Sequence, residues 1–202
     1  LTAYETYFSE KRPFFMADID IFETPIEIFY SRRIGEKAWG QGMTIYESTD
    51  RQDNDTLYYD VPEIIKSAGK LTGKTESGLS YGLLGTVATL DDSSRWANLM
   101  TKGENRYYFV TRIKQDLFEG NSFVGLMTTS SLADSAYTFS MDGRTNLLDN
   151  QLGIDGQIIM TSEEHKGIYG NISYYPSGFF SGWIDYYHYD KDINLNDMGY
   201  LW

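Results

Sequence analysis

Residues 106–117 read RYYFVTRIKQDL, in which two kinds of side chain alternate. One set is Tyr107, Phe109, Thr111 and Ile113, and the other includes Arg112, Lys114 and Asp116. Successive side chains of a β-strand point to opposite faces, so this period of two predicts a strand with one apolar and one charged face.

The same alternation recurs along the chain after residue 70. It is visible in the segments 79–88, 137–142, 151–160, 168–174 and 180–189. Turn-forming sequences separate these segments: Glu76-Ser77-Gly78, Glu119-Gly120-Asn121, Leu148-Asp149-Asn150 and Pro176-Ser177-Gly178. We therefore predict an all-β, antiparallel up-and-down meander of roughly eight or nine strands. Helix is expected only as short turns at 1–8 and 61–67.

Two architectures fit such a meander. A soluble β-sandwich turns its apolar faces inward, whereas an outer-membrane barrel turns them to lipid and its polar faces to the lumen. The chain has Tyr 17, Phe 11 and Trp 4, which together make 16%, and amphipathic aromatic rings are enriched at membrane interfaces. Together with the charged strand faces, this favours part of an outer-membrane-type β-barrel, a curved or partly closed sheet.

Composition excludes several classes of function. With 29 acidic and 17 basic residues the net charge is −12, which argues against nucleic-acid binding because that requires a basic face. The absence of cysteine rules out disulfides and thiolate metal sites within this sequence. No apolar run approaches the ~18 residues of a membrane-spanning helix.

Three segments that precede most of the predicted strands carry lysine or arginine among apolar or glycine-rich residues. They are 10–15 (EKRPFF), 30–35 (YSRRIG) and 70–74 (KLTGK). The candidate site residues of this lumen charge network are Glu10, Lys11, Arg12, Arg32, Arg33, Lys70 and Lys74. Three interpretations remain open: an internal salt-bridge network, a cationic constriction for an anionic solute, and a contact site for a partner or for lipopolysaccharide phosphates. On a strand, Arg32 and Arg33 would point to opposite faces, whereas Lys70 and Lys74 would share one.

Catalytic and metal-binding signals are weak. The two histidines, His165 and His188, have no recognisable nucleophile beside them in sequence. The acidic stretches 50–55 and 190–192 offer oxygen ligands but lack the glycine and terminal glutamate of an EF-hand loop. We predict no catalytic residue, no metal and no cofactor.

The spaced motifs resemble a known bacterial family. LTAYETYFSEKRPFFMADIDIF at 1–22, FYSRRIG at 29–35 and KLTGKT at 70–75 carry the resemblance, followed by GLLGTV at 82–87, RIKQDL at 112–117 and NDMGYL at 196–201. The chain is similar to the domain of unknown function 5916. One departure is Ala17-Asp18, where the family usually shows Glu-Gly.

The resemblance implies a C-terminal outer-membrane β-barrel region that follows a domain resembling family-9 carbohydrate-binding modules. We expect the sequence to be an excerpt of a longer protein, with 1–202 as a single barrel fragment. Within it, 1–69 would hold the motif-bearing segment, packed on the concave side, and an acidic loop at 47–60, and 70–202 would form the meander.

The expected function is non-catalytic solute passage or surface handling of carbohydrate in the bacterial outer membrane. The expected partners are outer-membrane lipid and a carbohydrate or other small solute. Two alternatives are a carbohydrate-active, glycoside-hydrolase-associated surface protein and a structural anchor for an upstream carbohydrate-binding module.

Overall fold

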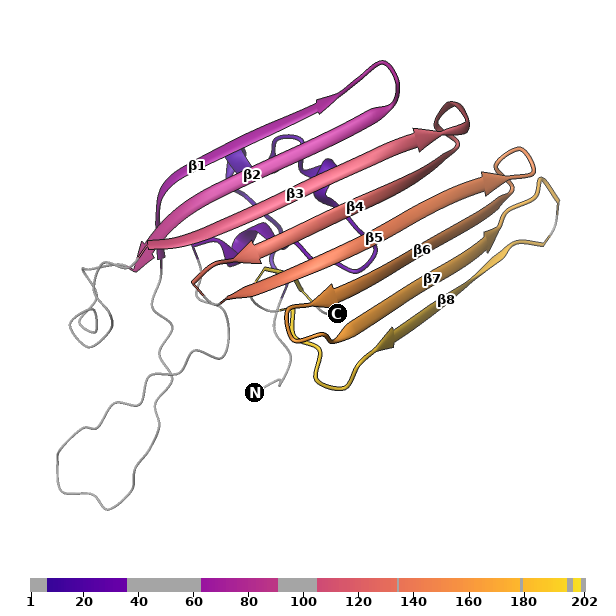
Figure 1. Cartoon of the computed structure of the whole chain (residues 1–202). Helices are drawn as coiled ribbons and strands as arrows, with labels where there is room; N and C mark the ends of the chain where they lie inside the picture. Colours follow the sequence, from indigo (N-terminus) through magenta and orange to yellow (C-terminus); the bar gives the residue numbers. More distant parts are fainter. Residues whose placement is uncertain are drawn as a thin grey trace.

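In the part of the chain that the structure describes, eight antiparallel strands form one sheet in sequence order (Figure 1). The computed structural model describes residues 7–35, 63–90, 105–133, 135–178, 180–195 and 198–200. The strands are β1 (Glu63–Lys74), β2 (Leu79–Leu90), β3 (Asn105–Leu117), β4 (Ser122–Ser131), β5 (Ala136–Leu147), β6 (Leu152–Thr161), β7 (Lys166–Tyr174) and β8 (Gly182–Tyr189). Each pairs with its neighbours in sequence, and β1 and β8 are the edges of the open sheet that these described strands form.

The helices among the described residues are short. Three lie in the N-terminal segment: α1 (Pro13–Met16) and the 3-10 turns η1 (Ile19–Phe22) and η2 (Ser31–Arg33). A further turn, η3 (Phe118–Gly120), connects β3 to β4. The antiparallel meander and its turns are thus as the sequence predicts.

Two local predictions were wrong. The expected helix at 61–67 is strand from Glu63 onward, because Ile64 and Ile65 pair with Thr89 and Ala88 of β2 and this pairing overrides local helix propensity. Residues 7 and 8 of the other expected helix, at 1–8, are not helical. The acidic loop at 47–60 lies outside the described residues.

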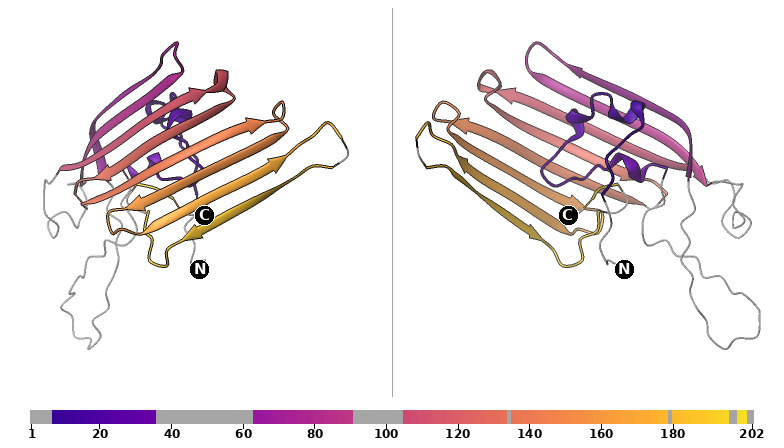
Figure 2. Two further views of the ribbon diagram at one scale, coloured as in Figure 1. Left: turned by 45° about the vertical axis from the view of Figure 1, so that its right-hand side comes forward. Right: turned by 180° about the vertical axis from the view of Figure 1, so that it is seen from behind.

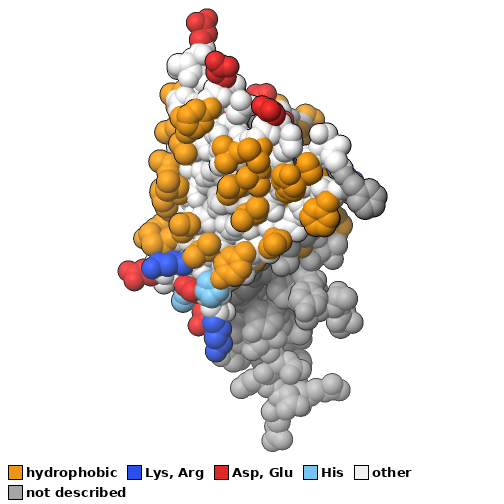
Figure 3. All heavy atoms as spheres, turned by 90° about the vertical axis from the view of Figure 1, so that its right-hand side faces the viewer, with side chains coloured by type: hydrophobic (Ala, Val, Ile, Leu, Met, Phe, Trp, Pro, Cys, Tyr) orange, Lys and Arg blue, Asp and Glu red, His pale blue; other side chains and the backbone are white. Residues whose placement is uncertain are grey.

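The register keeps apolar side chains together on the outward, convex face. Outward residues of one strand pair with outward residues of the next, so that they form rows across the sheet. One such row is Leu71, Leu83, Thr111, Thr128 and Phe139. Exposed apolar residues on this face include Leu83, Phe109, Ile113, Leu126, Met141, Ile158 and Ile172. In Figure 3 hydrophobic side chains form a band, and charged side chains gather beyond its two ends.

The N-terminal segment, residues 7–35, covers part of the concave face, in agreement with the expected placement (Figure 2). Apolar residues of that segment pack against inward-facing strand residues and against residues near the C-terminus. The cluster includes Phe15, Phe22, Ile26, Ile28 and Ile34, then Leu84, Val110, Met127 and Ile159, and finally Leu195 and Met198. The hydrophobic core therefore lies between the sheet and its own N-terminal segment.

Two glycines of β2 test this packing. A Cβ at Gly82 would lie 2.8 Å from the Phe22 ring, whereas one at Gly85, on the outward face, would lie 3.5 Å from the Phe109 ring. We expect Gly82→Ala to lower the free energy of unfolding by about 1–3 kcal/mol through overpacking, and Gly85→Ala to change it by less than about 0.5 kcal/mol. Denaturant titration of the two variants measures the difference, and equal effects would contradict the docking of Phe22.

Candidate functional site

A buried ion pair lies at the centre of the concave face. Alternation turns Arg112 of β3 and Asp142 of β5 inward, and both side chains are 2% exposed. The guanidinium donates Nη1 to Oδ1 and Nη2 to Oδ2, the latter over 2.7 Å. Such a bidentate pair is among the strongest side-chain contacts.

Gly125 of β4 makes this pairing possible. It lies between the two partners in the sheet, opposite Asp142, and a Cβ there would be 2.7 Å from Arg112 Nη1. The guanidinium therefore crosses β4 over a position that has no side chain.

Gln157 of β6 attaches the N-terminal segment to the sheet. Its Oε1 accepts the Ile26 backbone N–H, and its Nε2 donates to the Ile26 carbonyl over 3.1 Å and to Ser140 Oγ over 2.9 Å. The Gln157 amide thus hydrogen-bonds both the N–H and the carbonyl of Ile26, as the backbone of a neighbouring strand would. Buried backbone groups require such partners.

A second attachment is made by β1. Lys70 Nζ donates to the carbonyls of Phe14, over 2.6 Å, and Ala17, and Thr72 Oγ1 donates to Asp18 Oδ2 over 2.8 Å. A lysine at carbonyls that end a helical turn is a common C-terminal cap.

Asp18 lies where the backbone adopts a conformation that favours glycine. Its φ is 49°, in the left-handed region, where glycine is favoured and aspartate is one of the better-tolerated alternatives. The Asp18 carboxylate accepts a hydrogen bond from Thr72.

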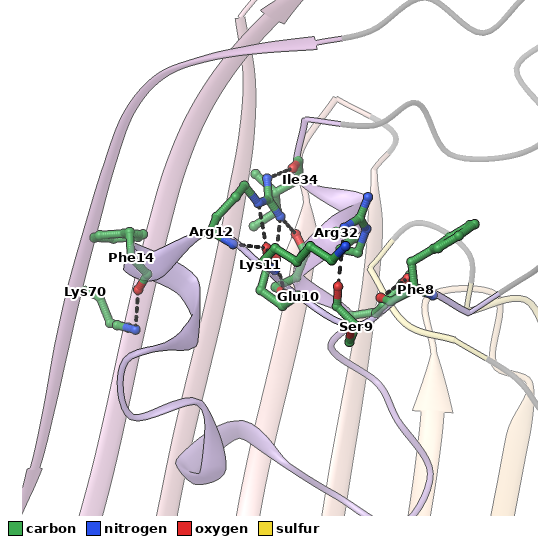
Figure 4. A network of polar contacts seen from close by, with 11 residues as sticks. Phe8, Ser9, Glu10, Lys11, Arg12, Phe14, Arg32, Ile34 and Lys70 are labelled. Atoms are coloured by element: carbon green, nitrogen blue, oxygen red, sulfur yellow. Dashed lines mark hydrogen bonds and ion pairs between the residues drawn. The ribbon is translucent and has the colours of Figure 1, made fainter.

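Glu10 joins the first two basic segments (Figure 4). Its carboxylate accepts hydrogen bonds from Arg12 Nη2 over 2.7 Å and Ser31 Oγ over 2.6 Å. Arg12 also donates to the backbone carbonyls of Ile34 (2.6 Å) and Ser31 (2.7 Å). Its guanidinium carbon lies 4.2 Å from the centre of the Phe15 ring. These contacts fold residues 10–15 back onto residues 31–34.

The other predicted site residues lie at separate places. Arg32 donates to the Ser9 carbonyl (3.3 Å), Arg33 to the Gly199 carbonyl (3.1 Å), and Lys74 pairs with Asp116. Lys11 is exposed, and its backbone N–H donates to Glu10. Arg32 and Arg33 lie in η2 rather than on a strand. Of the seven residues, the structure brings Glu10 and Arg12 into one ion pair, and the Lys11 backbone N–H joins the same carboxylate. The side chains of Arg32, Arg33, Lys70 and Lys74 lie beside other partners.

The alternation of the sequence predicted that Arg112 lies on the polar face of a strand. It did not identify Arg112, Asp142 or Gln157 as site residues. The sequence feature that marks these residues is a charged or amide side chain at an inward position of a strand whose outward positions are apolar. Pairing Arg112 with Asp142 requires the register of three strands, which no local pattern contains.

The acidic and histidine side chains do not form a metal-binding group in the part of the chain that the structure describes: no group of three or more His, Cys, Asp and Glu side chains there is arranged to hold a metal ion. His165 lies 3.8 Å from Glu163 and His188 lies 3.9 Å from Asp190, near strand ends. The described helices are all too short or too polar to cross a membrane.

The fold and these contacts define an all-β protein whose open meander holds its own N-terminal segment on a polar concave face. The whole chain, residues 1–202, matches the family model described as a domain of unknown function (DUF5916), and it belongs to that family. Searches of curated proteins and of solved structures found no match.

Removing one partner of the buried pair should be costly. We expect Asp142→Ala to lower the free energy of unfolding by about 3–5 kcal/mol, because Arg112 is left buried without its counter-charge. Lys74→Ala, which breaks a more exposed pair, should cost about 1 kcal/mol or less. The double variant Arg112→Met/Asp142→Leu should lose less than Asp142→Ala. Denaturant unfolding measures all three, and equal losses for Asp142→Ala and Lys74→Ala would refute the assignment.

Two carboxyl groups of the N-terminal segment make stability depend on pH in opposite directions. Burial opposes ionisation of Glu10, but hydrogen bonds from Arg12 and Ser31 outweigh it and lower its pKa from 4.5 to about 2. Burial raises the pKa of Glu27 from 4.5 to about 7, against a hydrogen bond to Tyr7. Glu10 therefore stabilises the fold above pH 4.5 and loses this effect as the pH falls toward 2. Glu27 stabilises it below pH 4.5 and loses this effect as the pH rises through 7.

We expect Glu27→Gln to remove the loss of stability between pH 4.5 and 7, and Glu10→Gln to remove the loss on the acid side. Melting temperatures measured from pH 3 to 8 separate the two effects. An unchanged profile for Glu27→Gln would show that its carboxyl is not buried in the folded protein.

Proposed function

We propose that this chain is part of a β-barrel in the bacterial outer membrane, with the N-terminal segment filling part of its lumen. The observation that carries the proposal is the polarity of the sheet. Its outward face is apolar and exposed, whereas its inward face buries charged and amide side chains such as Arg112, Asp142 and Gln157. This is the polarity of a membrane barrel.

Charge is nearly missing from the outward face. Among the outward positions of the eight described strands, Lys166 at the start of β7 is the only formally charged side chain, apart from Lys66 in the bulge of β1. A lysine or arginine at the middle of the lipid layer costs about 2–4 kcal/mol, and lipid contact accounts for this exclusion.

A soluble sandwich accounts for the outward face less well. The core of the molecule is already formed on the concave side by the N-terminal segment. A sandwich would therefore need a further apolar layer over the convex face, because soluble proteins rarely leave so large an apolar surface in water. Lipid supplies such a layer without another protein element.

The proposal requires closure of the sheet. Unpaired edge strands invite uncontrolled pairing with other chains, and β1 and β8 are edges here. We propose that further strands of the full-length protein pair with both edges, which would make the concave face the wall of a polar lumen.

Within this barrel we propose non-catalytic passage or handling of a small solute. A structural anchor is the second candidate, and the attachment of the N-terminal segment through Gln157, Lys70 and Thr72 favours it because such contacts hold an obstruction in place. Swelling of proteoliposomes containing the full-length protein in xylose or sucrose separates the two. Swelling above protein-free liposomes supports passage, and its absence supports the anchor.

Adjacent residues on β7 test the membrane proposal. The chain has no cysteine, so Ile172→Cys and Ser173→Cys place a fluorescent label on the outward and the inward face of one strand. In the full-length protein, with any other cysteine replaced, we expect lipid-borne quenchers to quench the label at 172 and aqueous iodide to quench the label at 173. Equal iodide quenching at both positions would contradict lipid contact.

A further inference from the structure

A groove lies on the concave face where the N-terminal segment does not reach. It is formed at the ends of β5–β8 near the turn at 148–150, and the right-hand view of Figure 2 shows these strand ends uncovered. Its volume is about 470 Å³, and its lining includes Arg144, Asn146, Asp155, Asn171, Ser173 and Trp183. Binding sites for small molecules typically have about 300–1,000 Å³.

The two charged side chains that line the groove are paired with each other, and its other polar groups are uncharged. Arg144 Nε pairs with Asp155 Oδ1 across β5 and β6, and Asn171 Nδ2 donates to Asp185 Oδ1 over 2.9 Å. Asn146 and Ser173 add an amide and a hydroxyl to the lining. Most small-molecule sites are predominantly apolar, so this lining suits a ligand with many hydrogen-bonding groups and little charge.

Glycine keeps the floor of the groove open. A Cβ at Gly153 of β6 would lie 2.6 Å from Ser173 Oγ and 3.4 Å from Asn146 Oδ1. A side chain at this position would therefore displace both polar groups from where they now face the groove.

Three aromatic residues line the β7–β8 side of the groove, Tyr169, Tyr175 and Trp183, and Tyr187 packs beside Tyr169. Trp183 is 65% exposed and Tyr187 is 53% exposed, although both lie at inward positions of β8. The ring of Tyr187 lies 4.9 Å from that of Tyr169, and the Tyr169 hydroxyl is 3.4 Å from Asp185. Exposed rings beside paired polar groups can cover the C–H face of a ligand whose edges carry hydroxyls.

We propose that this groove binds a neutral, hydroxyl-rich ring compound, a saccharide, through stacking on Trp183 and hydrogen bonds to Asn146, Asn171 and Ser173. The inference deepens the proposed function and rests on it, because the groove faces the lumen only if the sheet closes into a barrel. An anionic solute fits less well because the one guanidinium of the lining is already paired with Asp155.

The test is saturation-transfer NMR and calorimetry of the full-length protein with maltotriose, xylotriose and trigalacturonic acid. The protein is held in an amine-oxide detergent, because sugar-headed detergents would compete for the groove. We expect a neutral trisaccharide to bind and trigalacturonic acid to bind more weakly. Trp183→Ala and Asn171→Ala should each weaken neutral trisaccharide binding by about tenfold or more, which corresponds to the loss of about 1.4 kcal/mol or more. Tyr186→Ala, on the outward face of β8, is the matched control and should leave the affinity unchanged.

Absence of binding by wild type, or equal affinity of wild type and Trp183→Ala, would overturn the saccharide site. Tighter binding of trigalacturonic acid than of the neutral trisaccharides would overturn the proposal that the ligand is neutral. If sugars fail to bind while the label at 172 remains in lipid, the inference fails and the proposed membrane location stands. If sugars bind while that label is in water, the location fails and the groove stands.

Discussion

The concave face of the sheet buries charge, and a buried charge must be paired. Arg112 and Asp142 meet this requirement across β4, and Gly125 lets the guanidinium pass. Removing either partner would leave the other charge buried without a counter-charge, at the full cost of its desolvation. The pair forms in the register that the backbone ladders of β3, β4 and β5 set.

The same requirement explains why the N-terminal segment belongs to the fold. Its apolar residues cover inward-facing Leu84, Val110 and Met127, while Gln157 satisfies both backbone groups of Ile26. Without this segment the inner face would present isolated apolar residues among polar ones. The family motifs at 10–15 and 30–35 stabilise the segment itself through the contacts of Glu10, Arg12 and Ser31.

The sequence predicted the strands and their faces well, because alternation is a local property that each strand carries by itself. Tyr137, Phe139 and Met141 face outward, opposite Thr138, Ser140 and Asp142, as their pattern indicates. The predictions failed where the local conformation depends on residues distant in the sequence. Residues 63–67 form strand by pairing with β2, and Arg32 and Arg33 lie in a 3-10 turn. The Arg112–Asp142 pair depends on side chains 30 residues apart. The basic motifs predicted a polar interior, but not that their side chains would bind mostly backbone carbonyls.

Lipid on the convex face and a polar lumen on the concave face form the central claim of the proposed function. Ile158 and Ile159 are neighbours on β6 with opposite environments, 56% and 0% exposed. The most direct measurement is transfer of magnetisation from lipid acyl chains to isoleucine methyl groups in solid-state NMR of the full-length protein in bilayers. The account predicts rapid transfer to Ile158 and little to Ile159. Equal transfer to both, or none to Ile158, would contradict it.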